Sequence, residues 1–381
     1  MIIRAVYGPA AASVKRDPPA SVAPGRLCFA DPRYRCNTPF GSKALRPRSV
    51  AMSHGAYLLC VRQVPFCVAG MICLLLVTPA AAQSLPAYAP INPIAQSRSG
   101  VYFQPYREPR LGHLSLDVRL DYGSAIEYNL PSSRPSYLLD AEILRLEVAA
   151  ARDLNQQFFL FGTIGVGGAY AGFLDGFLNW YHGLLGLKLP ERTSRPDNSF
   201  AYQMALNNGL TVARSPSDLF LNDLRLGAGY RPTPWYQGVV TLTLPTSTAP
   251  DGYGRGTISL SALNTFHTRL SSRFTFEGAL GLGWTPTHGD LSPYQETMFA
   301  SLASGLRFRF WGRQSLFATV FYHSPYYHGT TLPALDRREL SLDFGWLLAT
   351  KGGSEWRIGM TEDLEPSGPA IDIIFRLGGS F

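Results

Sequence analysis

The stretch HLSLDVRLDY (residues 113–122) alternates apolar and polar side chains from end to end. One set is Leu114, Leu116, Val118, Leu120 and Tyr122, and the other is Ser115, Asp117, Arg119 and Asp121. Because successive side chains of a β-strand point to opposite faces, the stretch predicts a strand with one apolar face and one charged face.

The same alternation recurs over residues 273–284, 298–310 and 339–348. The predicted strands have about 10–14 residues, whereas strands of soluble proteins average ~5–6. Aromatic residues gather near their ends, as in the interfacial girdles of membrane barrels: Tyr122, Tyr230, Trp284, Trp311 and Trp356. These features favour an all-β fold, an antiparallel transmembrane β-barrel with apolar side chains toward lipid and polar side chains toward the lumen. A secreted β-sandwich is the alternative that alternation alone leaves open.

The number of strands follows from the turns, because barrels of this kind alternate short turns at one end with longer loops at the other. The alternation holds only if residues 170–219 lie on the extracellular side, so that 199–213 does not span the membrane. About twelve strands result, with ten or fourteen as alternatives. They are 113–122, 138–151, 156–169, 220–231, 235–246, 257–269, 273–285, 297–310, 314–324, 337–349, 354–362 and 370–381.

The first 82 residues differ from the rest of the chain. They hold 10 of the 34 Lys and Arg, 2 of the 27 Asp and Glu, and all five cysteines, which leaves 24 basic and 25 acidic groups in residues 83–381. This balance removes the main support for nucleic-acid binding by the body of the chain. The lack of cysteine excludes a disulfide framework or a cysteine metal site there.

Residues 52–82 have the pattern of a secretory signal peptide. Arg62 precedes an apolar run at 66–77, which is too short for a membrane-spanning helix of ~20 residues. The small residues at 80–82 predict cleavage between Ala82 and Gln83; a short buried helix is the alternative. Met52 is then the expected start, and residues 1–51 are a non-native or disordered leader. A Pro-rich segment at 83–112 precedes the barrel at 113–381.

Residues 170–219 break the strand pattern and are therefore the best candidate for function. Apolar residues between 173 and 185 recur every three to four positions, which predicts a helix with a polar opposite face. A polar ligand site or gate at the barrel mouth is one interpretation. The other is a helix over or inside the lumen, held by ion pairs and hydrogen bonds. The candidate residues are Asp175, Asn179, His182, Arg192 and Arg195.

Three motifs resemble those of the domain of unknown function 3187 family, predicted outer-membrane barrels of Proteobacteria. They are FLDGFLNWYHGLLGL (173–187) followed by Arg192, YHSPYY (322–327) and TEDLEPSGPAIDIIFRLG (361–378). The resemblance covers most of residues 100–381. It implies a barrel in the outer membrane of a Gram-negative bacterium, and it implies no particular activity.

Eight charged residues are predicted to face the lumen. Small barrels fill their interiors with mutually paired arginines and carboxylates, which stabilise the barrel without conducting anything. The eight are Arg119, Arg225, Arg273, Glu277, Arg307, Arg309, Asp343 and Arg376.

The sequence gives little support to catalysis. Barrel lipases place His and Ser on one strand face as His-x-Ser, whereas His323 and Ser324 are adjacent and point to opposite faces. No pair of histidines has zinc-ligand spacing, and the glycine-rich stretch at 162–172 has no Walker lysine. We therefore expect no catalytic residue, no metal and no cofactor.

Two functions remain, a narrow channel or transporter for small or apolar solutes and a non-conducting structural or interaction barrel. A lipid-modifying barrel enzyme is a weaker third. Expected partners are outer-membrane lipid, lipopolysaccharide and the barrel assembly machinery; nucleic acid is not expected, and the oligomeric state stays open. The last strand should pair with the first, and the terminal Phe381 is, by resemblance to other barrels, the assembly signal. Its predicted lipid-facing residues are Ile371, Ile373, Phe375, Leu377 and Phe381.

Overall fold

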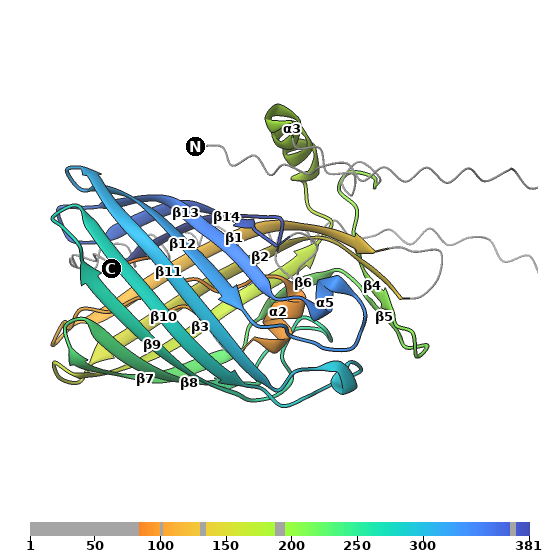
Figure 1. Cartoon of the computed structure of the whole chain (residues 1–381), viewed down its shortest axis with the longest axis horizontal. Coiled ribbons are helices and arrows are strands. Elements are labelled where there is room, and N and C mark those ends of the chain that lie inside the picture. Colours follow the sequence, from red (N-terminus) through yellow and green to blue (C-terminus); the bar gives the residue numbers. More distant parts are fainter. Residues whose placement is uncertain (1–83, 100–101, 130–134, 187–194, 366–370) are drawn as a thin grey trace, which may run out of the picture. The chain divides into compact units, whose positions relative to one another are not determined.

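The computed structural model describes residues 84–99, 102–129, 135–186, 195–365 and 371–381. Within these ranges, twelve antiparallel strands form a closed barrel (Figure 1), which confirms the predicted fold. The strands are β1 (Leu114–Asn129), β2 (Ser136–Asp153), β3 (Phe158–Tyr170), β7 (Leu224–Thr233), β8 (Tyr236–Leu244), β9 (Ser259–Arg269), β10 (Phe274–Trp284), β11 (Met298–Trp311), β12 (Gln314–His323), β13 (Glu339–Ala349), β14 (Glu355–Asp363) and β15 (Ile373–Ser380).

The first and last strands close the ring. The register of β1 and β15 runs from Asp117 opposite Ser380 to Ser124 opposite Ile373. Beyond it, the Phe381 N–H donates to Leu116 O at 2.7 Å, and the Leu116 N–H donates to Phe381 O at 3.0 Å. The predicted pairing of the two strands is confirmed, and it extends to the last residue.

The wall of the barrel has an apolar outside and a polar inside. On β10, the side chains of Leu280 and Leu282 are 54% and 61% exposed. The side chains of Glu277 and Ala279, which belong to the opposite face of the strand, are buried. The alternation predicted from sequence is therefore observed. We call the exposed apolar side chains of the strands the outer belt. It includes Leu280, Leu282, Leu302, Leu306, Ile358 and Leu377.

The last strand departs from its prediction at both ends. Leu377 is exposed on the outer belt as expected, but Ile371 and Ile373 are buried at the far end of the strand. Phe381 is also buried, and its ring packs edge-on against Trp356 with 5.4 Å between the centroids. All three buried side chains lie at the two ends of this segment, and the exposed Leu377 lies between them.

Glycines make room for aromatic rings on the inner face. Phe317, Gly345 and Gly359 lie side by side on β12, β13 and β14. The Phe317 ring lies over both glycines, and a Cβ at Gly345 would collide with this ring and with the backbone of β14. A larger residue at 345 is therefore incompatible with this packing.

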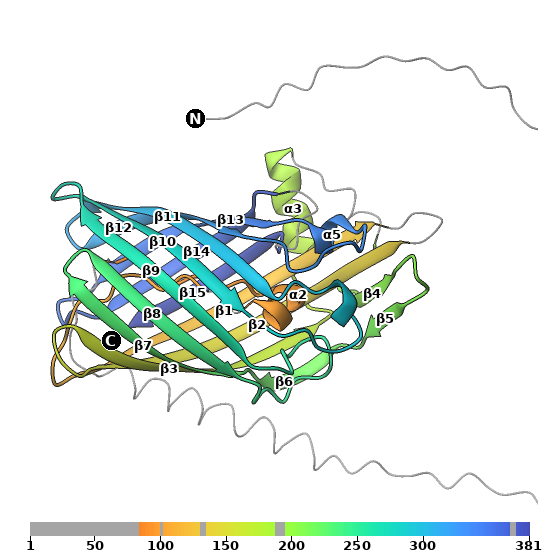
Figure 2. The same ribbon diagram turned by 60° about the horizontal axis from the view of Figure 1, so that its bottom comes forward.

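At one end of the barrel the connections are longer, and extra strands extend the wall. β1 continues to Asn129, so the connection predicted at 123–137 shortens to 130–135. The hairpin β4 (Ala201–Ala205) and β5 (Thr211–Arg214) pairs with the start of β2, and β6 (Ser217–Leu221) pairs with the end of β3. The hairpin lies beyond the ring of strands (Figure 2), which confirms that residues 199–213 do not span the barrel wall.

Four short helices complete the described part of the chain: α2 (Pro93–Arg98), α3 (Asp175–Leu185), α5 (Pro333–Asp336) and the 3₁₀ turn η1 (Ser292–Tyr294). Among the described residues, no helix is both long and apolar enough to cross a membrane. α2 lies within the ring of strands near the end with the long connections, whereas α3 lies outside the ring (Figures 1 and 2). The short turns, and the carboxyl terminus, lie at the opposite end.

Candidate functional site

The lumen is filled by the segment that precedes the first strand. We call residues 84–99 and 102–110 the plug. Its side chains at Tyr88, Ile91, Ile94 and Phe103 are at most 1% exposed. Two hydrogen bonds join its two arms, from the Tyr88 N–H to Phe103 O (3.1 Å) and from the Phe103 N–H to Tyr88 O (3.0 Å). The sequence predicted only a Pro-rich segment here and gave it no place in the lumen.

Arginines of the wall bind backbone carbonyls of the plug. Arg145 donates to Pro90 O and Ala89 O, both at 2.7 Å, and Arg376 donates to Ala89 O at 3.1 Å. Arg119, Arg231 and Arg307 make further bonds of this kind, to the carbonyls of Ala87, Arg107 and Ser84, and Arg255 of the β8–β9 loop donates to the carbonyl of Ser99. Hydrogen bonds from charged donors are stronger than neutral ones, so this set holds the plug along its length.

Two buried carboxylates of the wall also bind the plug. Glu277 accepts the N–H of Leu85 (3.2 Å) on one oxygen and the N–H of Tyr106 (3.1 Å) on the other. Glu339 accepts the hydroxyl of Tyr88 at 2.9 Å. Glu277 therefore fixes both arms of the plug at once.

Helix α2 anchors the plug near the long connections. Its Asn92 cap accepts the Ile94 N–H at 2.9 Å, and Pro93 occupies the first turn, where no N–H is needed. Arg98 in its last turn donates to the carbonyls of Thr285, Pro286 and Glu296 at 2.6–3.0 Å. Burial lowers the pKa of Arg98 to about 10, so the guanidinium stays charged at neutral pH.

Most of the predicted lumen charges are buried inside the barrel. These are Arg119, Arg225, Glu277, Arg307, Asp343 and Arg376. Their partners include carboxylates that were not among the eight predicted lumen charges. Asp121 lies 2.6 Å from Arg145, and Glu147 accepts from both Arg119 and Arg225.

Arg273 and Arg309 do not belong to this interior, which corrects the prediction. Both are exposed, and the Arg309 guanidinium donates to the carbonyl of Ser272 in the β9–β10 turn. Arg273 precedes the first residue of β10, and Arg309 lies near the end of β11. Both are therefore at the rim of the barrel, where side chains meet solvent.

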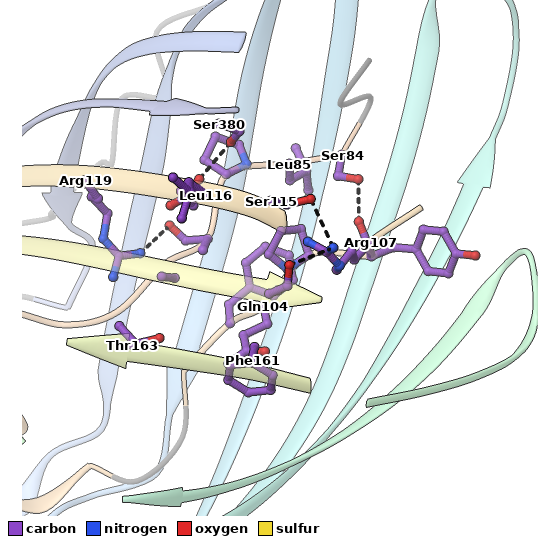
Figure 3. A pocket seen from close by; sticks show the side chains of 18 of the residues that line it. Ser84, Leu85, Gln104, Arg107, Ser115, Leu116, Arg119, Phe161, Thr163 and Ser380 are labelled. Atoms are coloured by element: carbon purple, nitrogen blue, oxygen red, sulfur yellow. Dashed lines mark hydrogen bonds between the residues drawn. The ribbon is translucent and has the colours of Figure 1, made fainter. Parts of the chain in front are cut away.

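Two cavities lie beside the plug among the described residues. The larger, of about 210 Å³, lies in the half of the barrel with the short turns, between the plug and strands β1 to β3 (Figure 3). Arg107 crosses it to donate to Ser115 Oγ at 3.0 Å (Figure 3). The smaller, of about 30 Å³, lies nearer the long connections. Tyr102, Glu147 and Arg225 line both cavities, so the two meet at these side chains.

These three residues form a layer that we call the constriction. The Arg225 guanidinium lies 4.1 Å from the centre of the Tyr102 ring and 2.9 Å from Glu147 Oε1. The Tyr102 hydroxyl accepts from Arg255 at 3.0 Å. Arg225 and Glu147 belong to the wall, whereas Tyr102 belongs to the plug.

The candidates of the 170–219 segment that the structure describes line neither cavity. Asp175 accepts the Asn198 N–H at 2.7 Å, and Asn179 donates to Asp197 at 3.1 Å. Arg195 donates to Asp140 of β2 at 2.8 Å. These contacts tie α3 to the segment after it and to the wall. His182 is buried on the same side of α3, and Arg192 lies outside the described residues.

The structure does not join His323 and Ser324 in a catalytic pair. His323 Nδ1 lies 2.6 Å from the Ser324 carbonyl oxygen, and its Nε2 lies 3.2 Å from Ser99 Oγ of the plug. The Ser324 hydroxyl instead accepts the Ala300 N–H at 3.0 Å. In the described part of the chain, no three His, Cys, Asp or Glu side chains are grouped as metal ligands.

A closed barrel with an apolar outer belt and a polar, filled interior defines a β-barrel of the outer-membrane type. The chain belongs to the family described as a protein of unknown function (DUF3187), whose profile matches residues 114–381. The match confirms the resemblance seen in the sequence motifs. It begins at the first residue of β1 and so covers the barrel without the plug.

Solved structures of other barrels are similar to this chain. The COG4313 outer membrane channel from Pseudomonas putida F1 has 12% sequence identity and a TM-score of 0.46, over 72% of this chain and 96% of that one. The NanC porin has 9% identity and a TM-score of 0.40, over 70% and 98%. A FadL homologue from Pseudomonas aeruginosa has 12% identity and a TM-score of 0.36, over 80% and 98%. No curated protein matches the sequence.

Proposed function

We propose that the protein is an outer-membrane channel for small solutes, including apolar ones, and that the plug closes its lumen in the state described. The observation that carries this proposal is the pair of cavities that meet at the constriction. A barrel built only as a scaffold has no need of two cavities separated by a single layer of side chains. The outer belt supports a place in the membrane, with the long connections on the extracellular side.

The constriction couples passage to movement of the plug. A solute that moves between the cavities must displace the Tyr102 ring, which lies against Arg225. Because Tyr102 belongs to the plug, a shift of the plug removes the ring from the path, while Arg225 keeps its contact with Glu147. The plug is then the moving part, and the wall stays intact.

The lining of the larger cavity indicates the kind of solute. Apolar side chains of the plug and the wall face it, among them Leu85, Phe159 and Phe161. Arginines and carboxylates face it as well, but most of them are paired with each other. Such a surface suits a small, largely apolar molecule with a few polar groups better than a multiply charged ion.

Planar-bilayer conductance tests the proposal. We expect small, infrequent steps from the wild type and a larger conductance from Tyr102→Ala, because the ring that separates the cavities is gone. Deletion of α3 (Asp175–Leu185) is the control, and it should leave the conductance unchanged because the helix lies outside the ring of strands.

The competing function is a closed structural or interaction barrel. The many buried ion pairs around Asp121, Glu147 and Glu355 favour it, since such pairs can simply fill an interior. If wild type, Tyr102→Ala and a variant without residues 84–106 all insert as folded barrels and none conducts, the channel proposal is wrong.

A further inference from the structure

On helix α3, polar side chains are buried and large apolar side chains are exposed, the reverse of a helix on the surface of a soluble protein. Its polar side chains Asp175 and His182 are only 7% and 6% exposed. By contrast, Phe173 just before the helix, Trp180 and Leu184 are 69%, 62% and 69% exposed. With Phe177 these side chains recur at intervals of three to four residues and so form one continuous face. The face contains no charged residue.

This exposed face is continuous with the outside of the barrel. The Phe173 ring lies 5.4 Å from Tyr122 of β1, and the Phe177 ring lies 6.1 Å from Phe375 of β15. Tyr122 and Phe375 alternate along their strands with the buried Asp121 and Arg376, so they point outward. The aromatic face of α3 therefore continues the outer belt at its rim.

The helix is fixed in this position by its amino-terminal end. Glu142 of β2 accepts the backbone N–H groups of Phe173 and Leu174 as well as the hydroxyl of Tyr122. Gly172 before them has a φ of +73°, and any side chain there would collide with the Glu142 carboxylate. Such contacts set the orientation of the helix, so the outward direction of its apolar face is built into the fold.

We propose that α3 is embedded in the lipid of the outer leaflet beside strands β1 and β15, with its aromatic face against the acyl chains. Lipid is the favoured occupant because the face extends a surface that the bilayer already surrounds. Aromatic side chains also prefer the boundary between acyl chains and headgroups. This inference rests on the membrane location of the barrel and is independent of whether the barrel conducts.

Lipid quenching of a fluorescent label tests the proposal. The five cysteines Cys28, Cys36, Cys60, Cys67 and Cys73 are first replaced by serine, which leaves a chain without thiols. Single cysteines are then introduced as Trp180→Cys on α3, Leu280→Cys on the outer belt and Asp251→Cys in the exposed β8–β9 loop. Each is labelled with bimane, and the protein is reconstituted into phosphatidylcholine vesicles with and without doxyl-labelled lipid.

We expect the label at 180 to be quenched by shallow doxyl lipid at least half as strongly as the label at 280. The label at 251 should be quenched several-fold less. Quenching at 180 equal to that at 251 would show that the face meets water and would overturn the proposal. Disulfide-linked dimers through residue 180, with no quenching, would assign the face to a second copy and overturn it as well. If the label at 280 is not quenched, the barrel is not in the bilayer, and both this proposal and the proposed location are wrong.

Discussion

Removing the Glu277 carboxylate should release the plug. This side chain of β10 is fully buried and accepts one backbone N–H from each arm of the plug, those of Leu85 and Tyr106. Its third contact, at 2.9 Å, is with His267 Nδ1 on the neighbouring strand. Glu277→Ala therefore breaks both plug contacts without altering the plug itself.

The size of the effect follows from the two bonds lost. A hydrogen bond to a charged group contributes about 1.5–3 kcal/mol, so the two together contribute about 3–6 kcal/mol. Water that enters the lumen can bind the two freed N–H groups, so we take the lower end, about 3 kcal/mol. Every 1.4 kcal/mol is a factor of ten, and the fraction of molecules with a loosened plug should rise about a hundredfold.

The rate of cysteine labelling in the plug measures this fraction. Ala87 lines the larger cavity, and Ala87→Cys should react slowly with a bulky maleimide while the plug is seated. Glu277→Ala should raise that rate about a hundredfold. Glu277→Gln should have an intermediate effect, because the amide keeps an acceptor for one N–H and turns a donor toward the other.

The matched control is Arg269→Ala. It breaks the ion pair between Arg269 of the wall and Glu108 of the plug, which is 3.4 Å long and exposed on both sides. Exposed pairs contribute less than about 1 kcal/mol, so the labelling rate should change only a few-fold. If Glu277→Ala, folded to the same extent as wild type, is labelled no faster than Arg269→Ala, then Glu277 does not hold the plug.

Three further predictions concern the barrel. Deletion of Phe381 removes the two backbone hydrogen bonds beyond the β1–β15 register and should lower the heat-modifiable fraction in the membrane; an unchanged fraction contradicts an assembly role. Gly345→Ala should destabilise the barrel by about 1–3 kcal/mol in urea titrations in detergent. Gly238→Ala should have little effect, because the nearest neighbouring atom would lie 3.6 Å from the added Cβ. Asp121→Ala leaves buried arginines without their carboxylate and should cost about 3–5 kcal/mol, against less than about 1 kcal/mol for Asp290→Ala, whose ion pair with Arg214 is exposed on the aspartate side. Equal midpoints for the two aspartate variants would refute this ranking.

The wall of the barrel was predictable because its signal is local. Alternation over ten residues defines each strand, and the turns between strands fix their number. The prediction of 273–285 for β10, observed as Phe274–Trp284, is typical of the agreement. The rim was less predictable. Alternation assigns a side chain to a face, but it does not show where along the strand the lumen ends, and for this reason Arg273 and Arg309 were misplaced.

The plug was missed because its contacts are not local. Its Tyr88 binds Glu339, which lies 251 positions away in the sequence, and its backbone has no periodic pattern. One signal was nevertheless present. The predicted lumen charges comprised six arginines and only two carboxylates, and this excess of donors required acceptors from elsewhere. Some of those acceptors are wall carboxylates such as Asp121 and Glu147, and others are the carbonyls of the plug.

The position of α3 shows a related difficulty. Its helical spacing was clear from the sequence, but the spacing does not show which face meets the protein. Proximity to a charged lumen suggested a helix that covers the mouth or enters the barrel. The structure instead turns the polar side chains toward the protein and the aromatic ones outward, as expected where the surroundings are lipid.

The way in which the plug is held also bears on whether it can leave. Arg145 binds two plug carbonyls but keeps Asp121 as a partner, and Arg307 binds Ser84 O but keeps Glu355 at 2.5 Å. When the plug moves, Arg145 and Arg307 lose neutral acceptors that water can replace and keep their carboxylates. Asp153, which binds Arg107 of the plug, likewise keeps Arg231 of the wall as its partner. Removal of a plug bound through ion pairs would instead strand charges in the lumen, at a cost of several kcal/mol each. The wall arginines bind the plug mainly through its backbone carbonyls and not through carboxylates. The plug can therefore leave the lumen without separating most of the buried ion pairs.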